Sequence, residues 1–159
     1  MEGSLASVLK SWGSTAETPV VKTPHFPQDL IIAVKEKKAV EGFSAWSEKG
    51  GIPHVQPPVE ILENLLTLRI HLDDCDADNG ALKVIPKSHL YGKLNSEQII
   101  CLKQAAKVYI CTAKAGDVLM MRPLLLHSSS ASVQPCDRRV LHIEYGALKL
   151  PDGLEWFNS

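Results

Sequence analysis

The sequence lacks the features of several protein classes. It has no apolar run long enough to cross a membrane, and its N-terminus does not show the basic-then-apolar order of a secretory signal. Its formal net charge is only -1, so no basic surface for nucleic acids or acidic membranes is indicated. We therefore expect a soluble, cytoplasmic protein that binds neither membranes nor nucleic acids.

Several catalytic motifs are also missing. The chain has 4 cysteines, but no two of them form a Cys-x-x-Cys pair. Such scattered thiols are poor evidence for a zinc site, and a reducing compartment gives little reason for disulfides. The sequence contains no Gly-x-Ser-x-Gly elbow, no Gly-x-Gly-x-x-Gly fingerprint and no phosphate-binding P-loop. These absences argue against zinc, serine-hydrolase, dinucleotide and P-loop chemistry.

The length of 159 residues suits one hydrophobic core and is too short for two ordinary domains. Residues 1–21 are rich in glycine and serine and are predicted to form a weakly structured leader. Residues 22–159 are expected to form one domain.

Short strands dominate the pattern of that domain. Residues 65–72 alternate between apolar and other side chains, which predicts a half-buried strand. The face that we expect to be buried consists of Leu66, Leu68, Ile70 and Leu72, and the opposite face of Thr67, Arg69 and His71. An Asn-Gly turn leads into a strand at residues 81–85, which predicts a long-looped hairpin. Further strands are expected at residues 108–112 and 118–122.

Residues 96–107 give the clearest helix signal, with Asn95 or Ser96 as the N-cap. Its apolar stripe consists of Ile99, Ile100, Leu102 and Ala106. Short strands, many turns and one or two covering helices fit a mainly β double-sheet jelly roll.

The stretch that most limits function is residues 116–145. A Gly-Asp turn starts an apolar strand that is expected to end on His127, and after ten intervening residues Arg138 opens a second strand. Imidazole is a good ligand for ferrous iron, and a guanidinium group binds a carboxylate through two parallel hydrogen bonds. This pattern suits an iron chelated by a small dicarboxylate. Taken singly, such residues are more often a loop histidine and a solvated arginine.

Several segments resemble the phytanoyl-CoA dioxygenase family. In order, they are residues 28–34, 52–58, 79–89, 116–127 and 138–145, so the likeness covers most of the chain after about residue 22. The resemblance implies a cupin-like double-stranded β-helix that binds Fe(II) through two histidines and one carboxylate. It also implies 2-oxoglutarate and O2 as cosubstrates, and hydroxylation of an aliphatic carbon of a small metabolite or acyl substrate.

The same resemblance suggests roles for individual residues. An iron-binding histidine of the family falls on His127, and the arginine that binds 2-oxoglutarate falls on Arg138. Ser129 matches a position that can add a hydrogen bond to the cosubstrate. Asp29 matches the carboxylate of the family's His-x-Asp ligand pair.

The sequence departs from the family next to Asp29. Pro27 stands where the histidine of that pair belongs, and proline cannot bind iron. His25 is the nearest replacement, but four residues of extended chain span about 13 Å, so both side chains reach one ion only if the chain bends. The other histidines, His54, His71, His89 and His142, are expected to be structural, with His54 the first substitute to consider.

Two further departures concern Lys87 and the N-terminus. Lys87 stands where the family commonly has glycine, and a positive φ there would carry a conformational cost. The residues before the His-x-Asp position do not resemble the family's longer segment, so we expect a truncated or divergent member.

Three functions remain open. The first is a dioxygenase that uses Fe(II) and 2-oxoglutarate, supported by Asp29, His127 and Arg138. The second is an inactive or weakened relative that keeps the fold as a binding module, supported by Pro27 and the short N-terminus. The third is a cupin-like isomerase or sugar-binding protein, which has no need of an arginine for a dicarboxylate. The sequence does not indicate the substrate.

Overall fold

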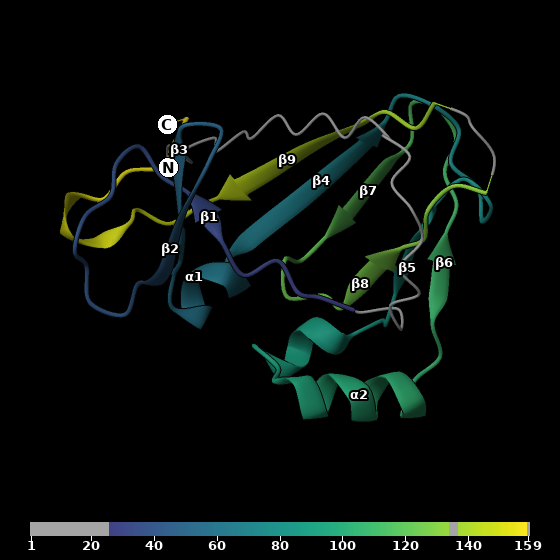
Figure 1. Cartoon of the computed structure of the whole chain (residues 1–159), viewed down its shortest axis with the longest axis horizontal. Helices are drawn as coiled ribbons and strands as arrows, with labels where there is room; N and C mark the ends of the chain where they lie inside the picture. The colour runs from purple at the N-terminus through teal and green to yellow at the C-terminus, as the bar shows by residue number, and fades with distance from the viewer. Residues whose placement is uncertain (1–25, 134–136, 159) are drawn as a thin grey trace.

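The computed structural model describes residues 26–133 and 137–158. The predicted leader and His25 lie outside the described residues. Within the described ranges the chain forms three antiparallel sheets of 3 strands each (Figure 1). No helix in these ranges is long and apolar enough to cross a membrane.

The strands are, in chain order, β1 (Ile32–Ala33), β2 (Ser44–Lys49), β3 (Ile52–Gln56), β4 (Leu65–His71), β5 (Leu82–Val84), β6 (Tyr109–Cys111), β7 (Val118–Met121), β8 (His127–Ser129) and β9 (Val140–Gly146). The helices are α1 (Val59–Glu63) and α2 (Ser96–Ala105), and the 3-10 helices are η1 (Ser88–Tyr91) and η2 (Pro151–Gly153). The sheets have the strand orders β1-β3-β2, β7-β4-β9 and β6-β5-β8.

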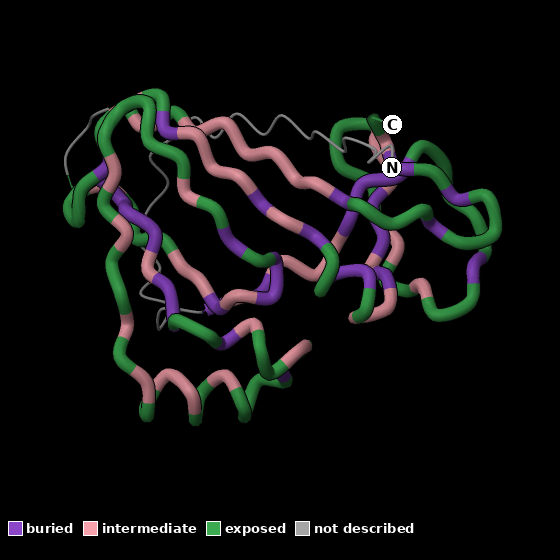
Figure 2. Tube along the Cα trace, turned by 180° about the vertical axis from the view of Figure 1, so that it is seen from behind, coloured by how far each residue is buried: buried purple, intermediate pink, exposed green. Residues whose placement is uncertain are grey.

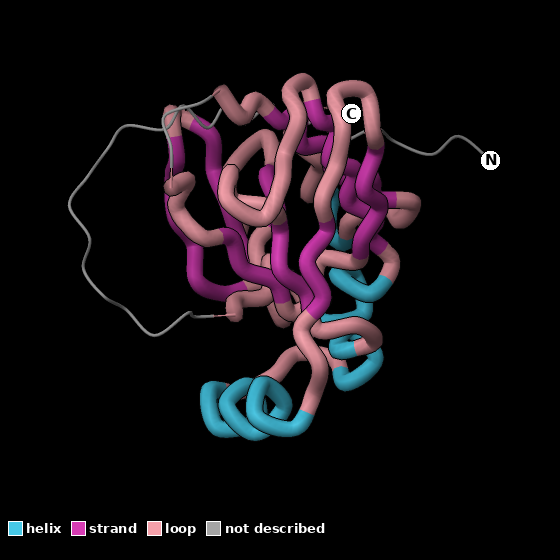
Figure 3. The backbone as a smooth tube through the Cα atoms, turned by 90° about the vertical axis from the view of Figure 1, so that its right-hand side faces the viewer, coloured by secondary structure: helices cyan, strands magenta, loops and turns pink. Residues whose placement is uncertain are grey.

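Two of the sheets enclose the candidate site. Residues of β4 and β9 line one cavity together with residues of β5 and β8, so the β7-β4-β9 and β6-β5-β8 sheets share that cavity. The helices lie at one end of the strands (Figure 3). The expectation of a mainly β, cupin-like jelly roll with one or two covering helices is confirmed.

The strand predicted at residues 65–72 exists as β4, but the prediction of its buried face is wrong. Thr67 and His71 are 0% and 2% exposed, whereas Leu72 is 52% exposed. The register places Arg69 opposite His142 of β9, and both line the cavity. The period of two is kept, but the polar side chains face inward because the sheet encloses a cavity with polar side chains instead of a purely apolar core.

The outer face of this sheet is correspondingly apolar. Leu68 pairs with Met120 of β7 and Ile143 of β9, and Ile70 pairs with Val118 and Leu141. Of these residues, Met120 and Val118 are the most exposed, at 66% and 51%. The alternation in the sequence therefore identified the two faces correctly and assigned them to the wrong sides.

Two further predictions about the strands are also wrong. Residues 65–72 and 81–85 do not form a hairpin, because β4 pairs with β7 and β9 while β5 pairs with β6 and β8. The apolar strand expected to run from the Gly-Asp turn to His127 is interrupted after β7. A turn closed by a hydrogen bond from Leu125 N to Arg122 O leads into β8, which belongs to the other sheet.

The main hydrophobic core lies at the β1-β3-β2 sheet. Its buried members include Val34, Val55, Leu62 and Trp156, and smaller buried stretches also lie along the other two sheets (Figure 2). Gly146 at the end of β9 packs against the Trp156 ring, where a Cβ would come within 2.6 Å of Cζ2. The C-terminal segment is thereby attached to the sheet that carries the site.

Helix α2 begins as predicted and ends two residues early, at Ala105. The side chain of Asn95 accepts a hydrogen bond from Gln98 N, and Gln98 returns one to Asn95 N, which completes a capping box. Ile99 and Leu102 pack on a small buried cluster, but Ile100 is 56% exposed, and no residue of the helix is fully buried. The helix covers the sheet only loosely.

Candidate functional site

The site is a cavity of about 530 Å³ between the β7-β4-β9 and β6-β5-β8 sheets. The charged and hydrogen-bonding residues that line it include Asp29, Arg69, His127, Ser129, Arg138 and His142. Four of the five site residues expected from the sequence are therefore in one cavity, and the fifth, His25, lies outside the described residues.

Asp29 and His127 are brought together by two backbone hydrogen bonds between their segments. Asp29 N donates to Pro123 O at 2.9 Å, and His127 N donates to Pro27 O at 3.2 Å. As a result, His127 Nε2 lies 3.6 Å from Asp29 Oδ2, with the side chains 13% and 35% exposed. Pro27 also lines the cavity, so a side chain at this position faces the site.

The hydrogen bonding of His127 suits a metal ligand. Its Nδ1 lies 2.8 Å from Leu125 O, and a carbonyl oxygen can only accept. The hydrogen of the neutral ring is therefore on Nδ1, which leaves the Nε2 lone pair directed toward Asp29. A backbone carbonyl that fixes the tautomer in this way is the usual partner of a metal-binding histidine.

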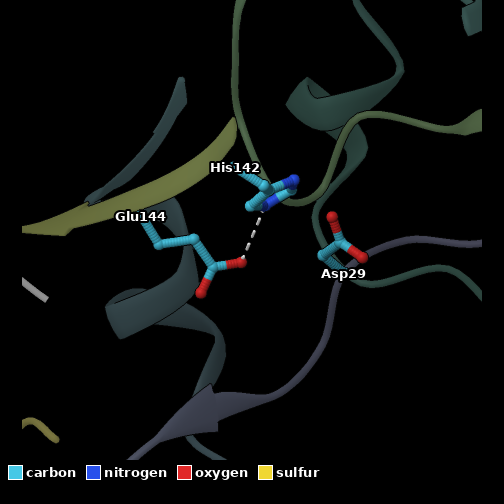
Figure 4. Close-up of side chains that lie close together, drawn as sticks. All are labelled: Asp29, His142 and Glu144. Carbon is cyan, nitrogen blue, oxygen red and sulfur yellow. Dashed lines mark ion pairs between the residues drawn. The ribbon is translucent and has the colours of Figure 1, made fainter. Parts of the chain in front are cut away.

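Strand β9 adds two residues that the sequence analysis missed. Asp29, His142 and Glu144 each offer a ligand atom within 4.8 Å of the others (Figure 4). His142 Nε2 is 3.4 Å from Glu144 Oε1, and these side chains are 14% and 12% exposed. The signal was the period of two in β9, which places His142 and Glu144 on the same face as Arg138.

His142 is a weaker candidate ligand than Glu144. Arg69 Nη1 lies 3.3 Å from His142 Nδ1, and a guanidinium group can only donate. The neutral His142 ring therefore carries its hydrogen on Nε2, the atom that faces Glu144. The Glu144 carboxylate keeps its lone pairs available for a cation.

Arg138 lines the same cavity and is held in place by hydrogen bonds. Its Nη1 donates to Gly80 O at 2.5 Å and to Ser129 Oγ at 2.8 Å, and Ser129 Oγ donates to Gly80 O at 2.8 Å. Gly80 has a φ of +69°, and a Cβ there would meet Ser130 O at 2.7 Å and Arg138 Nη1 at 2.8 Å. A glycine is therefore required for Arg138 to occupy this position.

The neighbouring Arg139 points elsewhere. Its Nε and Nη2 donate to the two carboxylate oxygens of Asp73, at 2.9 and 2.7 Å. This hydrogen bonding lowers the pKa of Asp73 to about 2. Of the two consecutive arginines, Arg138 thus lines the cavity and Arg139 forms an ion pair with Asp73 at the surface.

The other histidines do not complete the metal site. His54 lies in β3, is 3% exposed, and has its Nδ1 2.9 Å from Ile52 O. It is not among the residues that line the cavity, so it is not a substitute for the histidine missing at Pro27. His71 is buried at the end of β4, and burial together with the charge of Arg69 lowers its pKa.

The sequence matches the family described as Phytanoyl-CoA dioxygenase (PhyH) over residues 6–140. No curated protein matches the chain. A similar solved structure is EctD from S. alaskensis in its apoform, with 28% identity and a TM-score of 0.50, covering 61% of this chain and 39% of that chain.

Two further solved structures are similar over about half of this chain. EctD from S. alaskensis with 2-oxoglutarate and 5-hydroxyectoine has 27% identity and a TM-score of 0.49, with coverage of 54% of this chain and 32% of that chain. AviO1 from Streptomyces viridochromogenes Tue57 has 28% identity and a TM-score of 0.48, with coverage of 55% and 40%. The match thus spans less than half of each relative. Because the family match extends over residues 6–140 of 159, the chain belongs to the phytanoyl-CoA dioxygenase family.

Proposed function

We propose that this chain is an Fe(II)- and 2-oxoglutarate-dependent dioxygenase that oxidises an aliphatic carbon of a small molecule. The observation that carries the proposal is the meeting of two residue pairs in one cavity. Asp29 and His127 form the first pair. Arg138 and Ser129 form the second, and none of these four residues is adjacent to its partner in the sequence.

The donors near Asp29 fit ferrous iron in kind but are one imidazole short. Carboxylate and imidazole are the ligands of the family's facial triad, and Pro27 removes one imidazole. We assign a further protein donor to Glu144, because its ligand atom lies within 4.8 Å of that of Asp29. The cluster that brings these two carboxylates together contains His142 and not His127, and His142 carries its hydrogen on Nε2. Bound iron would supply the redox chemistry with O2.

Arg138 and Ser129 fit one carboxylate of 2-oxoglutarate. The guanidinium group can form two parallel hydrogen bonds to a carboxylate, and its orientation is fixed in advance by Gly80 O and Ser129 Oγ. This preorganisation lowers the entropic cost of binding the cosubstrate. A cupin-like sugar-binding protein or isomerase would have no use for this arrangement.

Iron affinity tests the proposed donors. Restoring the missing imidazole as Pro27→His should strengthen Fe(II) binding, because residue 27 faces the cavity. His127→Ala and Glu144→Ala should each weaken it, whereas His54→Ala, which removes a histidine outside the cavity, should not. The measurement is anaerobic titration calorimetry with Fe(II). Equal affinity in the parent chain and in both site variants would contradict the assignment and favour the inactive binding module.

A further inference from the structure

The cavity contains a second guanidinium group that the proposed function does not use. Arg69 comes from β4, on the strand's inward face, and lines the cavity together with Arg138. Its side chain was expected on a solvent-facing polar strand face. The register instead places it opposite His142 and Leu119, inside the molecule.

Arg69 is not neutralised by its surroundings. Among the described residues, neither Arg69 nor Arg138 forms an ion pair with a carboxylate. Arg69 Nη1 reaches only the neutral acceptor His142 Nδ1, and its buried Nε has no hydrogen-bond partner in the described part of the chain. Burial and the charge of Arg138 lower the pKa of Arg69, while Asp29 raises it.

A partly buried arginine without an anionic partner is costly, and two in one cavity also repel each other. A ligand with two negative ends would remove both penalties by placing one carboxylate at each guanidinium group. 2-Oxoglutarate is such a ligand.

We propose that Arg69 binds the second carboxylate of 2-oxoglutarate, so that the two arginines hold the dicarboxylate at both ends and it binds without metal. The proposal rests on the proposed 2-oxoglutarate site at Arg138 but not on iron. Without metal both oxygens of this carboxylate can face the guanidinium group, and when a metal is bound one of them can stay on Arg69 while the other contacts the metal. Arg69 would thus supply binding free energy for 2-oxoglutarate at a site where iron has lost the imidazole that Pro27 removes.

The test is titration calorimetry of the full chain in excess chelator. 2-Oxoglutarate and glutarate should bind with similar affinity, because both have two carboxylates and a keto group is needed only for chelation. Pyruvate, which has one carboxylate, should bind about tenfold or more weakly. Arg69→Met should weaken binding of 2-oxoglutarate and of glutarate about tenfold or more, whereas the matched control Arg139→Met should leave both unchanged, since Arg139 contacts Asp73 outside the cavity.

A second readout separates binding from folding. Without ligand, Arg69→Met should unfold at the same temperature as the parent or higher, because it removes a partly buried charge that Arg138 repels. If this variant does not fold, Arg69→Lys decides, because it keeps the charge and loses the planar fork; it should bind 2-oxoglutarate more weakly than the parent.

The outcomes distinguish this inference from the proposed function. Unchanged binding of 2-oxoglutarate by the folded Arg69 variant overturns it. So does binding that appears only after Fe(II) is added, a result that would leave the proposed function intact. Absence of binding both with and without Fe(II) would overturn the two together.

Discussion

At the scale of single residues, the chemistry of each candidate site residue depends on the hydrogen bonds that its side chain already makes. His127 has its hydrogen fixed on Nδ1 by Leu125 O and can offer Nε2 to a cation. His142 has the opposite tautomer, because Arg69 donates to its Nδ1. Two histidines near the same carboxylate therefore have different chemistry, and only one of them is prepared to bind a metal.

Arg138 is predicted to be the main contact of 2-oxoglutarate. Arg138→Lys should weaken binding more than tenfold, at least about 1.4 kcal/mol, because lysine lacks the planar fork that forms two parallel hydrogen bonds. Equilibrium titration with 2-oxoglutarate measures the effect, with Arg139→Lys as the matched control at the surface ion pair. If the two variants bind alike, Arg138 has been assigned the wrong role.

Lys87 is predicted to destabilise the fold. It has a φ of 67° and a ψ of 0°, a left-handed conformation that costs a residue with a side chain about 1–2 kcal/mol. Glycine avoids this cost but gains more freedom on unfolding, so Lys87→Gly should raise the free energy of unfolding by about 0.5–1 kcal/mol.

Urea denaturation measures this difference. Lys83→Gly is the control, since Lys83 lies in β5, where glycine should lower stability. A loss of stability in Lys87→Gly would show that the left-handed residue is not strained.

At the scale of elements, the pattern of β4 shows what a sequence can and cannot predict. Alternation identified the strand and its two faces, since side chains point to opposite sides at successive residues. It could not tell which face is inside, because that depends on whether the sheet covers an apolar core or a polar cavity. The strand connections were mispredicted for a similar reason: β5 pairs with β6 and β8, from distant parts of the chain, instead of with β4.

Two adjacent methionines of β7 test the assignment of the faces. Met121 is 5% exposed and packs with Leu82 and Val84, whereas Met120 is 66% exposed on the outer face. Met121→Ala should cost about 2–5 kcal/mol of unfolding free energy, as expected for a truncation in a packed core. Met120→Ala should cost less than about 1 kcal/mol.

Chemical denaturation of the two variants gives the comparison directly, because the residue type, the strand and the substitution are the same. A larger loss for Met120→Ala would reverse the faces and remove Arg69 from the cavity.

At the scale of the whole molecule, the sequence predicted the mainly β class and the family, because several short segments match in order. It also selected Asp29, His127, Ser129 and Arg138, which meet in one cavity although Asp29 is far from the other three along the chain. It did not predict Glu144 or Arg69 at the site, since their places depend on the register of β9 and β4. Long-range pairing, which local patterns do not encode, decided both.

The central claim is that one cavity binds iron and 2-oxoglutarate next to each other. The most direct measurement is an anaerobic titration of the chain with Fe(II) and then with 2-oxoglutarate, followed by visible absorption. Direct contact between the ferrous ion and the keto acid gives a weak charge-transfer band. The account predicts that this band appears and saturates at one 2-oxoglutarate per chain, and that it is lost in His127→Ala. No band in the parent chain, under conditions where Fe(II) and 2-oxoglutarate are both shown to bind, would contradict the account.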